Sequence, residues 1–215
     1  MKERSTQAVT EFSRALEAHE ADYGIELTAP QREAMCDYYD ILIAWNARLH
    51  LVAPCSPTEF ATRHILESLF ALPFIPTGAR LCDVGSGGGL PVVPCAIMRP
   101  DLSLTLIESN AKKSIFLREA LTRVGRMEQS NIINARFENI NAPPAELVTC
   151  RALDRFAEMF DKLIAWTPRE STMLLFGGNK LGARIAQSSL VHREIQIPRS
   201  SERFIFIIQR SSAKS

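Results

Sequence analysis

A glycine-rich stretch, LCDVGSGGGLPVVP at residues 81–94, constrains the fold more than any other part of the sequence. An apolar run leads to Asp83, glycine then occupies positions 85, 87, 88 and 89, and two prolines follow among aliphatic residues. A strand that passes through such a turn into a helix presents backbone amides to a ligand, because no Cβ is in the way. Prolines fit the first helical turn, where their missing amides are not needed. The stretch therefore predicts a strand, a ligand-binding turn and a helix.

The chain after residue 79 alternates short apolar runs with segments of helix length. The predicted strands are residues 80–84, 102–107, 132–136, 147–150, 172–176, 191–197 and 204–209. Predicted helices run to Met98, from Ala111 to Val124, to Trp166 and over a short segment after residue 176. Strands that alternate with helices form mostly parallel sheets, whose ligands bind at the carboxyl ends of the strands. We therefore predict an α/β fold with a doubly wound sheet.

The first seventy residues have helical patterns instead. Thr28 with Gln31, and Ser56 with Glu59, have the spacing of capping boxes, in which two side chains satisfy the free amides of a helix start. Apolar residues recur at helical spacing between them, and a second helix is predicted over residues 58–72. Prolines and a glycine at positions 73, 76 and 78 then break the pattern. The sequence thus predicts a small N-terminal helical extension, residues 1–76, and a main domain, residues 77–215.

Composition narrows the class of protein. With 46% hydrophobic and 23% charged residues, the chain suits a globular protein with its own core. No apolar run approaches the roughly 18 residues of a membrane span, so we expect a cytoplasmic protein without membrane contact. Five cysteines stand at irregular spacing with no CxxC pair, which favours neither a disulfide framework nor a metal site.

Positive charge is unevenly distributed, although the net charge is only +1. The segment around residues 112–126 carries Lys112, Lys113, Arg118, Arg123 and Arg126 against the single acid Glu119. Two interpretations remain open at this point. The cations form a face that binds nucleic acid, or they are the solvated side of a helix.

The spacing of the glycines favours one of two cofactor classes but does not decide between them, because the N-terminus of a helix would also accept a pyrophosphate. A dinucleotide-binding turn, G-x-G-x-x-G, needs glycine at position 90, where this chain has Leu90. Gly85, Gly87 and Gly89 instead form G-x-G-x-G, which favours S-adenosylmethionine. Glu108 follows about 20 residues later at a predicted strand end, where a carboxylate accepts hydrogen bonds from ribose hydroxyls. Phe137 and Glu138 are suited to holding an adenine. The alternatives are a surface acid at position 108 and a polar turn around a core phenylalanine.

Several separated stretches together resemble the glucose-inhibited division protein B family. They are AWNARLHLVA (44–53), RHILESL (63–69), DVGSGGGLP (83–91), ESNAKKSIFL (108–117), ARFENI (135–140) and CRAL (150–153), and they occur in the family's order and spacing. Members of this family methylate N7 of a guanine in small-subunit ribosomal RNA. The resemblance implies a Rossmann-like class I methyltransferase sheet, S-adenosylmethionine as the donor, and 16S ribosomal RNA or the small ribosomal subunit as the partner of a monomer without a metal.

The resemblance also implies roles for particular residues. Cofactor contacts carry over to Gly85, Leu90, Phe137, Glu138 and Arg151, and Glu108 occupies the family's acidic position, which is usually aspartate. Arg151 is the catalytic candidate, expected to contact both cofactor and substrate by a bidentate pair. RNA contacts are expected from residues near the cofactor cleft: Arg63, Lys112, Lys113, Arg118 and Lys180. His64 is interpreted as a hydrogen-bonded structural histidine.

Two positions depart from the family pattern. Val92 stands where glycine is usual, and the lysine that usually follows the fifth strand is displaced to Lys180 behind Gly177 and Gly178. Rival functions are a small-molecule methyltransferase, an RNA-binding or ribosome-assembly protein with weak or lost turnover, and a nicotinamide-dependent oxidoreductase, which Leu90 opposes. Guanine N7 has an exposed lone pair and no proton, so methyl transfer to it requires no general base.

Overall fold

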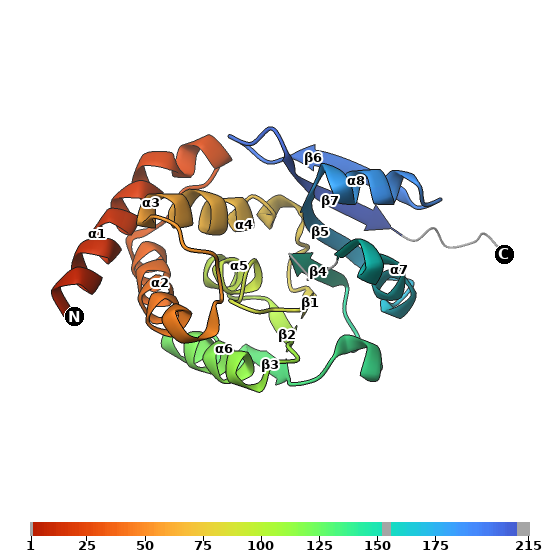
Figure 1. The fold of residues 1–215 in the computed structure, drawn as a ribbon, viewed down its shortest axis with the longest axis horizontal. Coiled ribbons are helices and arrows are strands. Elements are labelled where there is room, and N and C mark those ends of the chain that lie inside the picture. The colour runs from red at the N-terminus through yellow and green to blue at the C-terminus, as the bar shows by residue number, and fades with distance from the viewer. Residues whose placement is uncertain (1, 152–155, 210–215) are drawn as a thin grey trace.

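The fold is a seven-stranded sheet with helices on both faces (Figure 1). A computed structural model describes residues 2–151 and 156–209. The strand order is β3-β2-β1-β4-β5-β7-β6. The bounds are β1 Arg80–Val84, β2 Ser103–Ile107, β3 Ser130–Ile133, β4 Leu147–Arg151, β5 Thr172–Gly178, β6 Val191–Gln196 and β7 Arg203–Gln209. The predicted doubly wound α/β sheet is confirmed.

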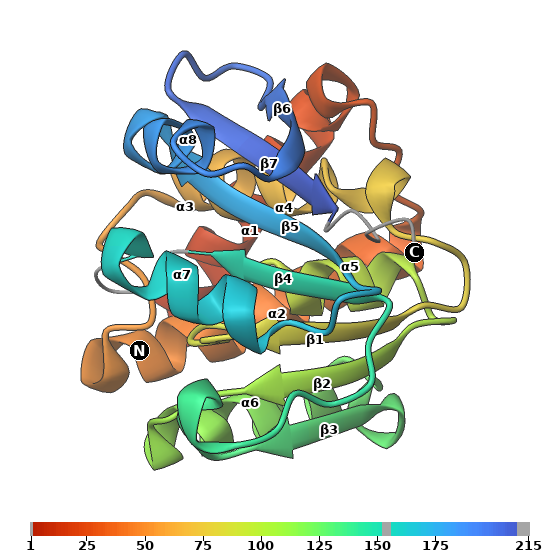
Figure 2. The same ribbon diagram turned by 90° about the vertical axis from the view of Figure 1, so that its right-hand side faces the viewer.

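Strands β1 to β5 are parallel, and β7 pairs antiparallel with both β5 and β6. The strand order reverses direction between β1 and β4, because β2 and β3 lie on one side of β1 and the later strands on the other. Figure 2 shows the arrowheads of β1 to β4 at one edge of the sheet. Open α/β sheets bind ligands at such a reversal point, beyond the carboxyl ends of the strands.

The helices divide between the two faces of the sheet. Their bounds are α1 Lys2–His19, α2 Ala29–Leu49, α3 Pro57–Glu59, α4 Glu67–Leu69, α5 Val92–Met98, α6 Ala111–Arg123, α7 Phe156–Trp166 and α8 Asn179–Ala186. Side chains of a strand alternate between faces, so that Leu81 packs in one hydrophobic core and Cys82 in the other. The first core also contains residues of α1, α2, α5 and α6, and the second contains residues of α7 and α8.

The N-terminal extension shares a core with the sheet. Phe12, Tyr38 and Phe60 are fully buried in the same cluster as Leu104 and Phe116 of the main domain. The capping box at the start of α2 is confirmed. The Gln31 side chain accepts from the Thr28 amide, and the Thr28 hydroxyl accepts from the Gln31 amide. The extension is therefore a layer on one face of the sheet.

Two predicted elements differ from the structure. The predicted helix 58–72 ends earlier, and its middle, Phe60–Leu66, is a wider π-helical segment between α3 and α4. The predicted strand 132–136 is β3, which begins at Ser130 and ends at Ile133. β3 lies at the edge of the sheet and its residues are only half-buried or exposed, so alternation of apolar residues defines its ends poorly.

Candidate active site

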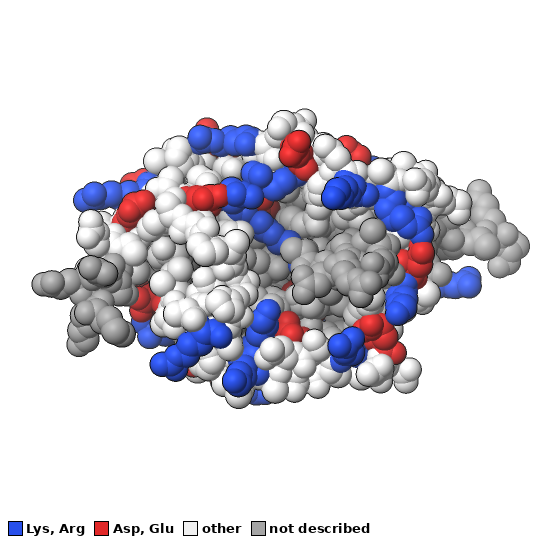
Figure 3. Space-filling model, viewed as in Figure 1, with Lys and Arg blue, Asp and Glu red and all other residues white. Residues whose placement is uncertain are grey.

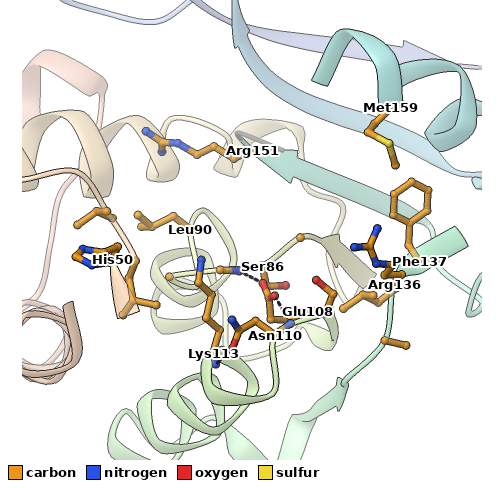
Figure 4. A pocket seen from close by; sticks show the side chains of 18 of the residues that line it. His50, Ser86, Leu90, Glu108, Asn110, Lys113, Arg136, Phe137, Arg151 and Met159 are labelled. Carbon is orange, nitrogen blue, oxygen red and sulfur yellow. Dashed lines mark hydrogen bonds between the residues drawn. The ribbon is translucent and has the colours of Figure 1, made fainter. Parts of the chain in front are cut away.

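A cavity of about 1110 Å³ lies at the carboxyl edge of the sheet. It is lined by segments from both the main domain and the extension: residues 50–53, 85–88, 107–110 and 135–138, with His64, Leu90, Lys113, Arg151, Met159 and Lys162. Figure 4 shows Arg151 and Glu108 on opposite sides of this cavity. The cavity therefore forms at the point where the order of the parallel strands reverses.

The three glycines of the G-x-G-x-G pattern do not share one role. All three have positive φ, +73° at Gly85, +50° at Gly87 and +82° at Gly89. Apart from its chain neighbours, a Cβ added at Gly87 would meet only the Gly85 carbonyl oxygen in the part of the chain that the structure describes, at 3.7 Å, so the space beside this cavity residue is open there. A Cβ at Gly89 would lie 2.7 Å from Val93 Cγ2 and 3.3 Å from Leu117 Cδ2. Gly85 and Gly87 thus line the cavity, whereas Gly89 allows α5 and α6 to pack closely.

Glu108 connects the glycine turn to the start of α6. Its Oε2 accepts from the Gly87 amide at 2.8 Å, and its Oε1 accepts from the Asn110 amide at 2.7 Å (Figure 4). The residue is 7% exposed and lines the cavity. An ionised carboxylate offers about four acceptor positions, so both oxygens retain capacity for a ligand. The predicted strand-end acid is therefore placed at the cavity, where it also orders the glycine turn.

The extension supplies one wall of the cavity, which the sequence reasoning did not foresee. The buried Tyr38 hydroxyl of α2 donates to the Gly88 carbonyl. Residues 50–53 follow α2 and line the cavity, and the Val52 amide donates to Asn46 Oδ1 at 3.0 Å, which closes this turn. The stretch AWNARLHLVA contains these residues. This stretch, which carries part of the family resemblance, is the sequence feature that points to the cavity wall. Helical spacing does not reveal which turn approaches the sheet.

The residues expected around an adenine line the opposite wall. Phe137 is 5% exposed and packs its ring edge to face against Trp166, with ring centroids 5.5 Å apart. Glu138 is exposed and, like Phe137, lines the cavity. Leu90 also lines the cavity, 9% exposed, on the side that Figure 4 shows opposite Phe137. The structure therefore brings these three expected cofactor residues to one cavity.

Arg151 ends β4 and lines the cavity, but its terminal nitrogens are directed at the extension. Nη2 donates to the Arg63 carbonyl at 2.6 Å and to Glu67 Oε2 at 3.4 Å. Nη1 donates to Ser68 Oγ at 3.0 Å and to the His64 carbonyl at 3.4 Å. The side chain is 15% exposed. A bidentate contact with a ligand through both Nη atoms would break these hydrogen bonds. The positive charge of the guanidinium attracts an anionic ligand in the cavity without any such change. Residues 152 and 153 of the CRAL stretch lie outside the described residues.

His64 differs from its interpretation as a hydrogen-bonded structural histidine. Its Nδ1 is buried and has no hydrogen-bond partner in the described part of the chain. Burial, together with the positive charges of Arg151, Arg63 and Arg203, lowers the pKa of His64 to about 3, and burial has the larger effect. The imidazole is therefore neutral near pH 7. It lines the cavity and packs against the Phe60 ring.

The cations expected to bind RNA are spread over the face that surrounds the cavity. Lys113 lines the cavity, and Lys112 and Arg118 are exposed on the same helix, α6. Arg63 is exposed and paired with Glu59. Lys180 is exposed at the start of α8 but does not line the cavity. Figure 3 shows Lys and Arg side chains above and below the middle of this face.

Two cavity cations were not among the residues predicted to contact RNA. Arg136 precedes Phe137, and Lys162 belongs to α7; both are exposed and line the cavity. Lys113, Arg136 and Lys162 form no ion pair with another described residue, unlike Arg123 at the far end of α6, which pairs with Asp37. The helical period could not show that Lys162 faces the cavity. Lys162 stands between the charged Asp161 and the apolar Leu163, so the pattern does not indicate which face of the helix it is on.

Asp83 is a buried carboxyl group directly before the glycine turn. It is 1% exposed, its Oδ1 accepts from Thr149 Oγ1 at 2.7 Å, and its Oδ2 has no partner among the residues described. Burial raises the pKa of Asp83 to about 7, although the hydrogen bond from Thr149 lowers it. The folded state therefore binds this proton more tightly than the unfolded state, whose carboxyl pKa is near 3.8.

We expect Asp83→Asn to change how stability depends on pH. The stabilising contribution of protonated Asp83 is complete below about pH 4 and is lost as the pH rises towards about 7, with a slope of about 1.4 kcal/mol per pH unit. Urea unfolding of both proteins at several pH values measures this slope. The wild type is expected to lose more stability than the variant between pH 5 and pH 7, because asparagine does not titrate. Equal losses would contradict the assigned ionisation.

The described residues 2–151 and 156–209 contain no group of three or more His, Cys, Asp or Glu that could hold a metal ion. Among the helices in these ranges, none has the length and apolar character that a membrane crossing requires.

Comparisons with known proteins place this geometry in context. The sequence model of the GidB family, described as rRNA small subunit methyltransferase G, matches residues 31–202. A ribosomal RNA small subunit methyltransferase G of Neisseria meningitidis serogroup C (strain 053442) is 34% identical over 157 residues, which are 73% of this chain and 73% of that protein. One of Xanthomonas campestris pv. campestris (strain B100) is 44% identical over 121 residues, 56% of each chain.

The solved structures show a similar fold. The mitomycin 7-O-methyltransferase MmcR matches with a TM-score of 0.59 and 14% identity, over 80% of this chain and 60% of that one. At this identity the similarity concerns the fold alone. It confirms the Rossmann-like fold that the resemblance implied.

Proposed function

This chain belongs to the rRNA small subunit methyltransferase G family, and we propose that it transfers the methyl group of S-adenosylmethionine to N7 of a guanine in 16S ribosomal RNA. The observation that carries the proposal is the glycine turn at the cavity. Gly87 leaves open space beside the cavity, and Glu108 accepts from its amide at 2.8 Å. A turn of this kind accepts the close approach of a nucleoside.

The residues around the cavity fit S-adenosylmethionine. Gly85, Gly87 and Leu90 would hold its amino-acid side, Glu108 would accept from the ribose hydroxyls, and Phe137 with Glu138 would hold the adenine. When bound, this group supplies an electrophilic methyl on a sulfonium. The volume of about 1110 Å³ exceeds the roughly 300–1000 Å³ that small-molecule pockets usually occupy, which leaves room for an RNA base beside the cofactor.

Methyl transfer to guanine N7 needs orientation more than proton transfer. The N7 lone pair is exposed, so no side chain has to remove a proton, and the enzyme contributes by holding the base in line with the methyl group and excluding water. Leu90 and Phe137 line the cavity with little exposed surface and would exclude water where a ligand packs against them. Arg151 is proposed as the residue that contacts cofactor and RNA, because its positive charge lies at the cavity and attracts a carboxylate or a phosphate.

The RNA is proposed to approach over the cations of the carboxyl edge. Lys113, Arg136 and Lys162 lie at the cavity itself, while Arg63, Lys112, Arg118 and Lys180 extend the positive face around it. Phosphate contacts supply much of the affinity of such interfaces, and splayed single-stranded bases supply the specificity. The bound RNA region is therefore expected to be a loop or bulge that can insert one guanine.

Lys113→Gln and Lys162→Gln are each expected to weaken binding of small-subunit RNA and to reduce its salt dependence. Every lost phosphate contact lowers the slope of log K against log salt by about 0.7. Binding measured by fluorescence anisotropy over a salt series tests this. Arg169→Gln is the matched control, because Arg169 is exposed in the loop before β5, at the amino end of that strand. Slopes that do not differ among the three variants would remove the two lysines from the interface.

The cofactor assignment is tested by isothermal titration with S-adenosylmethionine and, separately, with NAD. We expect saturable binding of S-adenosylmethionine and none of NAD, because Leu90 replaces the third glycine of a dinucleotide turn. Tighter binding of NAD would contradict the proposal.

A further inference from the structure

Glu67 is a fully buried carboxylate between two arginines that come from different strands. It begins α4, is 1% exposed, and is absent from the cavity lining. Arg203 at the start of β7 donates to Oε1 from Nε at 2.8 Å and from Nη2 at 2.7 Å. Arg151 at the end of β4 donates to Oε2 at 3.4 Å. One carboxylate therefore connects the extension to two strands of the sheet that are not neighbours.

The remaining contacts of Arg151 come from the same helical segment. The carbonyls of Arg63 and His64 and the hydroxyl of Ser68 accept from its two Nη atoms. Arg63 and His64 belong to the π-helical segment Phe60–Leu66, a type of helix that occurs frequently at functional sites. The Phe176 ring lies 5.6 Å from the guanidinium carbon. The plane of the guanidinium is thus fixed by acceptors on one helix and by an aromatic ring.

We propose that Glu67 is a positioning residue for Arg151, and that Arg203 in turn holds Glu67. The inference rests on the proposed function, in which Arg151 contacts cofactor and RNA. Glu67 does not line the cavity, so it acts through the guanidinium. The two arginines and one carboxylate leave one net positive charge, and the carboxylate determines where Arg151 presents that charge.

The charges make a purely stabilising role a poor explanation. Removing charged groups from water is costly, and a buried ion pair or triad often adds no stability over apolar side chains of similar volume. Arg203 holds Oε1 of Glu67 with two nitrogens, and a carboxylate held at one oxygen presents the other oxygen to Arg151 in a defined place. Positioning of Arg151 therefore explains why a buried acid lies behind this cavity-lining arginine.

A double-mutant cycle separates positioning from stability. Glu67→Gln is expected to lower the methyl-transfer rate by about 10²-fold, because small displacements of a positioning group have effects of this size. In an Arg151→Lys background the same substitution is expected to change the rate by less than about twofold, since the group that Glu67 positions is already altered. Equal factors in the two backgrounds, or no effect in the wild type, would overturn the inference.

A charge-neutral variant covers the case in which Glu67→Gln alone does not fold. Glu67→Gln combined with Arg203→Gln removes one charge of each sign, so that no additional unpaired charge is buried. This protein is expected to lose transfer as Glu67→Gln does while its Tm stays closer to that of the wild type. Asp101→Asn is the control: it breaks the partly exposed ion pair with Arg99 next to the amino end of β2 and should leave transfer unchanged. Full activity of the charge-neutral variant would overturn the inference.

A crystal structure of the Glu67→Gln protein provides a readout that does not depend on activity. We expect the Arg151 guanidinium to have left the carbonyls of Arg63 and His64. An unmoved guanidinium would overturn the positioning role, whatever the kinetics. Absence of transfer by the wild type would instead contradict the proposed function, and a displaced guanidinium would still support the positioning of Arg151 by Glu67.

Discussion

A Gly87→Val protein is expected to bind S-adenosylmethionine at least about 100-fold more weakly than the wild type, a difference of about 2.7 kcal/mol. Gly87 has φ +50° and lines the cavity, and among the described residues, its chain neighbours aside, an added Cβ would meet only the Gly85 carbonyl oxygen within 4 Å. The valine side chain would therefore occupy space that the cofactor needs. A β-branched residue also strains the backbone at positive φ. Isothermal titration measures the change in affinity.

The matched control is Gly125→Val. Gly125 has φ +67°, and no described residue beyond its chain neighbours lies within 4 Å of its added Cβ, but it follows α6 at the end away from the cavity. The backbone strain is therefore similar while the cofactor space is untouched. We expect the control to lose some stability and to keep its affinity. Equal affinity of the Gly87→Val protein and the wild type would show that the glycine turn does not hold the cofactor.

Arg151→Ala is expected to reduce methyl transfer to about 1% of the wild-type rate or less, because it removes the positive charge at the cavity. The same change is expected to destabilise the fold by about 2 kcal/mol, since Glu67 and two backbone carbonyls lose a charged donor. Thermal unfolding and transfer to small ribosomal subunits are measured on the same preparation.

The two effects of Arg151→Ala are separated by temperature and by a control. Transfer is measured well below the Tm of the variant, so that the folded fraction is close to complete. Arg169→Ala, at the opposite edge of the sheet, should change neither the rate nor the Tm noticeably, because its side chain is exposed. Wild-type turnover by folded Arg151→Ala protein would remove this arginine from the site.

The order of elements in the main domain could be predicted from the sequence because each carries its own local signal. The apolar run before Asp83 predicted β1 at residues 80–84, and the glycines predicted the turn that follows. The pairing of Thr28 with Gln31 predicted the start of α2. These signals depend on neighbours a few residues apart, so tertiary contacts did not alter them.

The walls of the cavity could not be predicted, because they depend on contacts between segments distant in sequence. Tyr38 follows the helical pattern of core residues, yet its hydroxyl reaches the Gly88 carbonyl fifty positions away. Gly89 belongs to the same pattern as Gly87, but the packing of Val93 and Leu117 makes it a close contact between helices. The contacts of Glu67 were hidden for the same reason, since Glu67 lies 84 positions from Arg151 and 136 positions from Arg203.

Some residues of the site could be predicted from local sequence signals, and others could not. Spacing indicated Gly85, Gly87 and Glu108, and the structure places them at one cavity, because they follow consecutive strands whose carboxyl ends meet. Charge clustering was a weaker guide, because it grouped Lys113 with Arg123, which pairs with Asp37 at the other end of α6. A run of cations along a helix distributes them over all its faces, and only packing decides which of them reach the cavity.

The most direct test of the central claim follows the methyl group itself. Purified protein is incubated with S-adenosylmethionine that carries a tritiated methyl and with small ribosomal subunits from cells lacking the modification, and the RNA is then digested to nucleosides. The account predicts label in N7-methylguanosine from 16S ribosomal RNA. Unlabelled RNA, or label confined to another nucleoside, would contradict it.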